Sequence, residues 1–301
     1  MVELYSNLPI EITTSFEKTM GGDVFNLLSM AQRLGSRTGF VTKLGNDTFA
    51  TFLRNSFLSR EINIDSVVSC NGYTGIYFVI LKDMGERQFI YYRSKSAASK
   101  LTFEDLDPKY LCDTKILHAS GITQAISQSS SLAVNHAFSI GKDSGVTISY
   151  DPNIRTKLCS LKVARNNFHK VAGYVDILLP TQEELLALHR TNSLTKAIDQ
   201  STSLGIKTIV IKKGENGCEL IHQGQSTRYS AMTGIDINDT TGAGDAFNGA
   251  FLHGIAQGMD PTESTKLALI ASGLKCRQRG AVDSQPCKDE VYNQYMLKHL
   301  Q

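Results

Sequence analysis

Short β-rich runs alternate with helical stretches along most of this chain, and this alternation constrains the fold more than any other feature. The β-rich runs lie at 115–119, 146–150, 175–179 and 207–211. The helical stretches that separate them lie at 127–143, 160–172 and 181–203. Strands that alternate with helices form a mostly parallel sheet covered on both faces. The sequence therefore predicts an α/β fold that binds its ligands at the carboxyl ends of the strands.

Two other parts of the chain extend and interrupt this pattern. Residues 23–34 and 48–60 have helical apolar spacing, on either side of a short buried strand at 38–44. Residues 66–98 instead carry three runs that predict antiparallel strands, at 67–68, 74–81 and 87–92, with a hairpin loop at 82–86. Because residues 2–14 are also strand-like, we expect a small sheet that stands off the main domain.

The composition is that of an ordinary globular chain. With 301 residues, 41% of them hydrophobic and 20% charged, it can form one large core or a core with a small appendage. The net charge of +2 gives no electrostatic reason to expect nucleic acid or a membrane surface as a partner. No apolar run approaches the ~20 residues of a membrane span, and no secretory leader is visible. The six cysteines are scattered without a Cys-x-x-Cys pair, so we expect reduced cysteines in a cytoplasmic protein.

Residues 239–250 carry the clearest chemistry. They predict a loop that turns into a helix, with Asp245 at the junction. Gly242 and Gly244 let the backbone approach a ligand, and the free N–H groups at a helix start form an anion site. Asp245 is then a carboxylate that accepts a proton beside a bound phosphate, as phosphoryl transfer to an alcohol requires. The alternative is that Asp245 only caps the helix.

This run resembles the signature of the ribokinase-like, or phosphofructokinase-B, sugar kinases. The resemblance implies that Gly242, Ala243 and Gly244 form the anion hole and that Asp245 deprotonates the acceptor hydroxyl. It also implies a three-layer α/β/α sandwich with a mostly parallel central sheet and a small β-sheet lid. The implied division is a lid of residues 1–20 and 66–98 and a core for nucleotide and substrate of residues 21–65 and 99–301.

A second stretch near the start, residues 21–47, resembles the other signature of this family. There the paired glycines and the asparagine line the sugar pocket, which implies this role for Gly21, Gly22 and Asn26. Family members usually begin with a hydrophobic strand that precedes the first lid strand. Residues 1–5 resemble the segment after that strand, so we expect the first core strand to be missing from this sequence.

The lid carries the clue to the substrate. Tyr91 and Arg93 share one face of a predicted strand, because successive side chains of a strand point to opposite faces. The planar guanidinium group of an arginine can donate two parallel hydrogen bonds to a carboxylate. Taken alone, the pattern favours a solvated lid strand with an exposed arginine. Residues 74–77 and 89–99 resemble the 2-keto-3-deoxygluconate kinases, which implies that Tyr77, Tyr91 and Arg93 contact a sugar acid.

Two strand ends add candidates for the substrate site. Asp151 and Asn153 are typical of an Asx turn, and Arg155 follows at the carboxyl edge of the sheet. In the family, the arginine of an Asp-x-Asn-x-Arg run faces the phosphate or the substrate. Ile122 follows another strand and resembles a substrate contact of the same subfamily, although an isoleucine there is more often plain packing.

The nucleotide side depends on the resemblance. Lys212, Gly214 and Gly217 resemble the turn near the nucleotide phosphates and ribose, with a plain turn between strands as the alternative. The family's Asn-x-x-Glu motif, whose glutamate organises water around magnesium, has Thr181 in place of the asparagine and keeps Glu184. An acid in a first helical turn is the alternative for that glutamate. There is no Walker phosphate loop.

The closing segments add an ion site. Asp239 and Thr241 match family positions that hold a monovalent cation such as K⁺. Near the end, Ala281 stands where some subfamily members carry an acid that contacts the sugar, so that contact is not expected here. Asp283 has no assigned role.

We therefore predict an ATP- and Mg²⁺-dependent kinase of a sugar acid, foremost 2-keto-3-deoxygluconate or its galacto epimer. The resemblance also implies a homo-oligomer that assembles through the lid. A kinase of a neutral sugar such as fructose or ribose is one alternative, and a non-catalytic sugar-binding protein on the same scaffold is another. A nicotinamide-dependent dehydrogenase is disfavoured, because no Gly-x-Gly-x-x-Gly follows an early strand.

Overall fold

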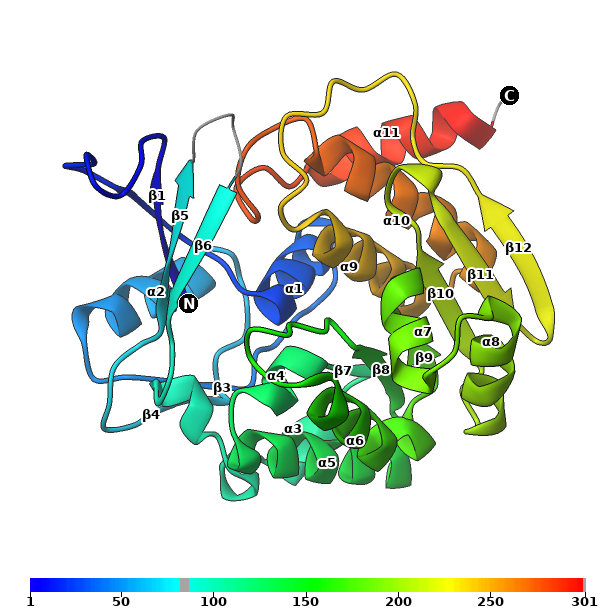
Figure 1. The fold of residues 1–301 in the computed structure, drawn as a ribbon, viewed down its shortest axis with the longest axis horizontal. Coiled ribbons are helices and arrows are strands. Elements are labelled where there is room, and N and C mark those ends of the chain that lie inside the picture. Colours follow the sequence, from blue (N-terminus) through cyan, green and yellow to red (C-terminus); the bar gives the residue numbers. More distant parts are fainter. Residues whose placement is uncertain (82–86, 300–301) are drawn as a thin grey trace.

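The main sheet has six strands in the order β12-β11-β10-β9-β8-β7 (Figure 1). The computed structural model describes residues 1–81 and 87–299, so the predicted hairpin loop at 82–86 lies outside the described residues. Strands β7 to β10 run parallel, and β11 and β12 form an antiparallel hairpin at one edge. Their bounds are β7 (Ile116–Ser120), β8 (Thr147–Asp151), β9 (Ile177–Leu178), β10 (Thr208–Lys212), β11 (Cys218–His222) and β12 (Gln225–Tyr229). The mostly parallel sheet is confirmed, and the hairpin is an addition that the sequence did not predict.

Helices cover both faces of this sheet, which gives the expected three-layer sandwich. The helices on one face are α1 (Asp23–Arg33), α9 (Ala243–Ala256), α10 (Pro261–Lys275) and α11 (Lys288–His299). Those on the other face are α5 (Gln128–Asp143), α6 (Leu161–Val171), α7 (Gln182–His189) and α8 (Leu194–Ser203). The short helices α3 (Pro108–Cys112) and α4 (Gly121–Ala125) precede and follow β7 along the chain. Within the described ranges, no helix combines the length and the apolar character that a membrane span requires.

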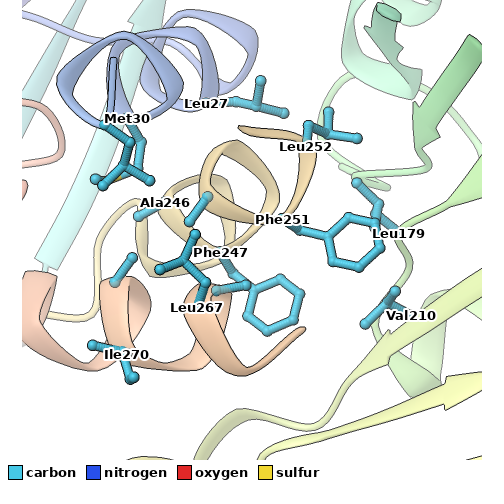
Figure 2. Packing of buried hydrophobic residues seen from close by; sticks show 14 of the residues in the cluster. Leu27, Met30, Leu179, Val210, Ala246, Phe247, Phe251, Leu252, Leu267 and Ile270 are labelled. Carbon is cyan, nitrogen blue, oxygen red and sulfur yellow. The ribbon is translucent and has the colours of Figure 1, made fainter. Parts of the chain in front are cut away.

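Helix α9 lies at the centre of the larger core. Figure 2 shows its side chains between α1 and α10, with Phe251 directed toward Leu179 and Val210 of the sheet layer. A Cβ atom on Gly249 would lie 2.3 Å from the carbonyl oxygen of Leu27, so a glycine is needed for α1 and α9 to approach this closely. The core therefore holds together α9, which carries Asp245 in its first turn, and α1, which carries Asn26.

A four-stranded sheet stands apart from the sandwich, as predicted (Figure 1). Its order is β2-β1-β5-β6, from β1 (Val2–Ser6), β2 (Glu17–Met20), β5 (Ile76–Leu81) and β6 (Arg87–Tyr92). Strand β1 pairs with β5 in parallel, and the other two pairings are antiparallel. We call this sheet the lid.

A third, two-stranded sheet corrects two predictions. Strand β3 covers only Thr42–Leu44, not 38–44, and it pairs in parallel with β4 (Val67–Ser69) outside the main sheet. The antiparallel lid strand predicted at 67–68 is therefore wrong. The reason is the connection: α2 (Thr48–Leu58) crosses over between the two strands, and such a crossover brings them into parallel alignment.

The helical stretch predicted over 181–203 is confirmed, but the chain forms two helices there, α7 and α8, with a break between them that was not predicted. Arg190 ends α7 in the left-handed region at φ 52°, and the Ser193 side chain then caps α8 by accepting from the amide of Lys196. No glycine or proline marks this break in the sequence.

Candidate active site

The loop at 239–244 leads into α9 and presents backbone amides at its end. Gly242 is the N-cap residue, with φ 75°, a conformation that favours glycine. The Ala243 amide donates to the Thr240 carbonyl at 3.1 Å, so it is used inside the loop. The amides of Gly242, Gly244 and Asp245 have no hydrogen-bond partner among the residues that the structure describes. The start of α9 is therefore able to bind an anion.

Asp245 faces α1 from the first turn of α9. The side-chain amide of Asn26 donates to Oδ2 of Asp245 at 2.7 Å. Burial and the nearby charge of Asp23 raise the pKa of Asp245 to about 7, although the Asn26 hydrogen bond acts in the opposite direction. A carboxyl group with this pKa accepts a proton near neutral pH. Asp23 was not predicted; its only sequence signal is its place one helical turn before Asn26.

A buried polar group lies behind the anion site. The Lys212 ammonium lies 2.8 Å from Oδ2 of Asp151 and 3.2 Å from Oδ1 of Asn248. The amide of Asn248 also donates to Asp151, at 2.5 Å. A Cβ atom on Gly244 would lie 4.0 Å from the Lys212 ammonium, so this positive charge is close to the free amides. Asn248 is a further residue that the sequence did not single out.

The paired glycines lie beneath the tyrosines of the lid. A Cβ atom on Gly21 would lie 2.0 Å from the hydroxyl oxygen of Tyr77, which explains the glycine there. The Tyr77 hydroxyl donates to Glu3, and its ring stacks on that of Tyr91 with centroids 5.8 Å apart. The Gly22 amide donates to Oδ1 of Asn26 at 3.2 Å. The predicted sugar residues of the lid and of α1 therefore meet.

The charges of two guanidinium groups act on Tyr91. Burial raises the pKa of the Tyr91 phenol, while the nearby charges of Arg155 and Arg93 lower it. Burial in turn lowers the pKa of Arg93. In the described ranges neither arginine has a carboxylate within ion-pair distance. This edge of the site is therefore suited to an anionic ligand.

Other predicted residues contribute structure. Ile122 is buried in α4, and no described contact links it to this cluster. Next to it, the Ser120 hydroxyl at the end of β7 donates to Asp23. Asp283, left unassigned, accepts from Thr19 of the lid at 2.6 Å and from Arg60, just after α2, at 2.9 Å.

The predicted nucleotide residues form two ordered turns. Gly214 and Gly217 have φ 58° and 81° between β10 and β11, and a Cβ atom on Gly217 would lie 2.0 Å from the Tyr229 carbonyl oxygen. Thr181 and Glu184 form a capping box at the start of α7. The Glu184 carboxylate accepts from the amides of Thr181 at 2.9 Å and Ile154 at 2.8 Å.

No group of three or more metal-ligating side chains occurs in the described part of the chain. Burial, then the charge of Asp151, raises the pKa of Glu184. Each of its carboxylate oxygens accepts one backbone amide, which fixes the group in a position to hold a metal-bound water. This arrangement fits Mg²⁺, which usually keeps several waters and binds through nucleotide phosphates with few protein ligands.

An open hollow of about 490 Å³ lies elsewhere, at the amino ends of β7 and β8 beside Lys115, Ser144 and Gln257. Asp245 lies beyond the opposite, carboxyl ends of these strands. We assign the hollow no role in the chemistry.

Comparisons with known proteins agree with this geometry. Residues 4–288 match the model of the pfkB family carbohydrate kinases. The chain is 31% identical to a 2-dehydro-3-deoxygluconokinase of Thermoproteus tenax, over 97% of this chain and 89% of that protein. It is equally 31% identical to a probable fructokinase-5 of Arabidopsis thaliana, over 93% and 89%. A putative ribokinase II of E. coli in complex with ATP and Mg²⁺ superimposes with a TM-score of 0.90 at 25% identity, covering 99% of this chain and 96% of that one.

Proposed function

The chain belongs to the pfkB family of carbohydrate kinases, and from this premise we propose that it transfers the γ-phosphoryl group of ATP to the terminal hydroxyl of a sugar acid. The foremost candidate is 2-keto-3-deoxygluconate. The observation that carries this proposal is the pair of guanidinium groups, Arg93 and Arg155, whose charges act on Tyr91 and which form no ion pair among the described residues, although the charge of Asp23 also acts on Arg93. A sugar-acid carboxylate would supply an ion-pair partner.

In the proposed mechanism Asp245 takes the proton from the hydroxyl as it attacks. Asn26 holds the carboxylate in place through its hydrogen bond to Oδ2. The amides of Gly242 and Gly244, with the Lys212 charge behind them, stabilise the charge that develops on the transferred group. ATP with Mg²⁺ supplies the phosphoryl group. The lid closes over the sugar and excludes water, which would compete as an acceptor.

The remaining assignments follow the sequence predictions. Gly21, Gly22, Tyr77 and Ile122 would line the sugar pocket. Thr181, Gly214 and Gly217 would contact the nucleotide, and Glu184 would act on magnesium through water. We further propose that the lid comprises residues 1–20 and the part of 66–98 that follows β4, that copies of the chain assemble through it, and that the protein works in the cytoplasm.

A neutral-sugar kinase is the second candidate, because a probable fructokinase is as similar to this chain as the sugar-acid kinase is. The discriminating measurement is kcat/KM for 2-keto-3-deoxygluconate, fructose and ribose in wild type, Arg93→Ala and Arg155→Ala. Each charge-assisted contact is worth roughly 1.5–3 kcal/mol, so each change should lower kcat/KM for the sugar acid by about 10–100-fold. Activity on a neutral sugar should change much less.

Arg228→Ala serves as the matched control, because Arg228 lies on the exposed edge strand β12. If the two arginine changes lower kcat/KM for all sugars equally, the arginines support the nucleotide or the fold instead. If wild type phosphorylates none of the sugars, the scaffold acts as a sugar-binding protein.

A further inference from the structure

The oxygens around Asp239, predicted to hold a monovalent cation, already have hydrogen-bond donors. Oδ1 accepts from the amide of Thr241 at 2.7 Å, and Oδ2 accepts from the amide of Gly280 at 2.9 Å. The backbone oxygen of Asp239 accepts from the ammonium of Lys275 at 2.8 Å. The Gly280 carbonyl in turn accepts from the hydroxyl of Ser284. A potassium ion placed here would need these oxygens and would be repelled by the ammonium beside them. The residues present therefore do not fit the ion.

Lys275 is fully buried, with 0% of its surface exposed, at the last position of α10. Burying an ammonium is costly unless it is hydrogen-bonded and matched by a negative charge. Asp239 is also buried, with 4% exposed, and its carboxylate needs a positive charge nearby for the same reason. The hydrogen bond from the Lys275 ammonium to the Asp239 backbone oxygen brings the two buried charged residues together.

The last turns of α10 hold the anion-binding loop at several points. The carbonyl oxygen of Cys276 accepts from the amides of Asn238 at 2.8 Å and Asp239 at 3.0 Å. One turn earlier, the Ser272 hydroxyl donates to the Ala243 carbonyl at 2.9 Å. Lys275 stands between Ser272 and Cys276 in the sequence. The position of its ammonium is therefore coupled to that of the free amides on the loop that these two residues hold.

We propose that the ammonium of Lys275 is the built-in cation of the loop at 239–244, so that this kinase uses no activating monovalent metal ion. The inference rests on the proposed kinase function. Lys275 acts as a positioning residue, because it holds the amides of Gly242 and Gly244 without touching the substrate. In its absence a small cation would take the vacated space between the same oxygens.

The first experiment compares kcat and KM in KCl and in tetramethylammonium chloride at matched ionic strength. Wild type should have the same kcat in both salts. Lys275→Ala should lose about 10²-fold in kcat in tetramethylammonium, the size of effect expected from a small displacement of catalytic groups. K⁺ or methylammonium should restore much of that loss. Lys266→Ala on the same helix is the matched control, because Lys266 is 41% exposed and its ion pair among the described residues is with its helix neighbour Glu263.

The second experiment needs no activity, so it separates this inference from the proposed function. The melting temperature of wild type should be equal in the two salts, while that of Lys275→Ala should rise with K⁺, because an ion that binds only the folded state stabilises it. Lys275→Met keeps more of the side-chain volume and gives the same readout if Lys275→Ala unfolds. The inference is overturned if K⁺ activates or stabilises wild type. It is equally overturned if folded Lys275 variants keep full activity, or lose it without recovery in any cation.

Discussion

At Asp245, opposing influences act on one carboxyl group. Burial and the charge of Asp23 raise its pKa, while the hydrogen bond from Asn26 and the charge of Lys212 lower it, and the result is a pKa of about 7. A general base with this pKa is ionised in half of the molecules at neutral pH. Its environment therefore makes the reaction rate sensitive to modest changes in pH.

The first prediction concerns this ionisation in catalysis. Since Asp245 must be deprotonated to act, kcat/KM should fall as the pH falls through about 7 and level off above it. Asp23→Asn removes a neighbouring negative charge, so this limb should move to lower pH. Asp245→Asn should lose about 10²–10⁴-fold in kcat while both substrates still bind. A pH profile unchanged by Asp23→Asn, or near-normal turnover of Asp245→Asn, would contradict the assigned roles.

The second prediction concerns stability. Folding raises the pKa of Asp245 from 3.8 to about 7, so ionised Asp245 disfavours the folded state once the pH exceeds the unfolded value. This cost grows as the pH rises and is complete above about pH 7. Asp245→Asn should therefore melt at a higher temperature than wild type at about pH 8, and the difference should shrink toward about pH 4. Thermal melting across this pH range is the test, and a variant less stable at every pH would argue against the raised pKa.

Single residues were predictable where a local pattern names them. Gly242 and Asp245 stand in one run, and Lys212 follows a buried strand, so the sequence indicated each. Asn248 and Lys275 were missed because their meaning depends on partners far along the chain. Asn248 bonds a residue 97 positions away, and Lys275 one 36 positions away. The spacing of residue types along the sequence does not show which distant residues come into contact.

At the scale of elements, strand β5 packs closely against the turn before α1 because Gly21 in that turn has no side chain. Gly21→Ala would put a Cβ atom 2.0 Å from the Tyr77 hydroxyl oxygen and push the lid strand outward. We expect a several-fold rise in the sugar KM and a lower melting temperature, with little change in the KM for ATP. Adding Tyr77→Phe removes the clashing oxygen, so the double variant should recover part of both losses. Losses that simply add would show that the two residues act independently.

Element boundaries divide into those with a sequence signal and those without one. Helix α10 begins at Pro261 after an Asp260 cap, and a proline after such a cap is a clear sequence signal of a helix start, although no helix was predicted there. The break at Arg190 was missed because a non-glycine residue adopts the left-handed conformation there. The hairpin strand β12 was missed because its residues are almost all exposed and polar, so they give no alternation of buried and exposed positions.

At the scale of the whole molecule, the main sheet and the small sheet of β3 and β4 each end in an edge strand. Among the described residues, β7 is the last strand of the main sheet and β3 pairs only with β4. Such edges carry unpaired N–H and C=O groups, which promote aggregation. We propose that one further strand can pair with this edge of the main sheet, beside β7.

A version of the chain extended by an in-frame strand before Met1 should then be more soluble and melt at a higher temperature. The control is an extension of equal length rich in glycine and serine, which does not form a strand. Equal melting temperatures for the strand extension and this control would count against the proposal.

The fold class itself was predictable, because the alternation of strands and helices recurs over most of the chain, so a few local errors do not change the prediction. Its layers, the separate lid and the parallel order from β7 to β10 agree with the sequence. The placement of β3 and β4 was not predictable, since short strands of three residues can pair with any free edge. Pairing of this kind is decided by packing in three dimensions.

The hydrogen bond between Asn26 and Asp245 joins residues 219 positions apart. A nascent chain on the ribosome can build most of the sheet before α9 has been synthesised, but it cannot yet bring these two side chains together. Contacts of such long range form late, because the entropy of closing a large loop opposes them. The active site would therefore form only near the end of synthesis. A protease cut between Asn26 and Asp245 would abolish turnover once the two fragments separate.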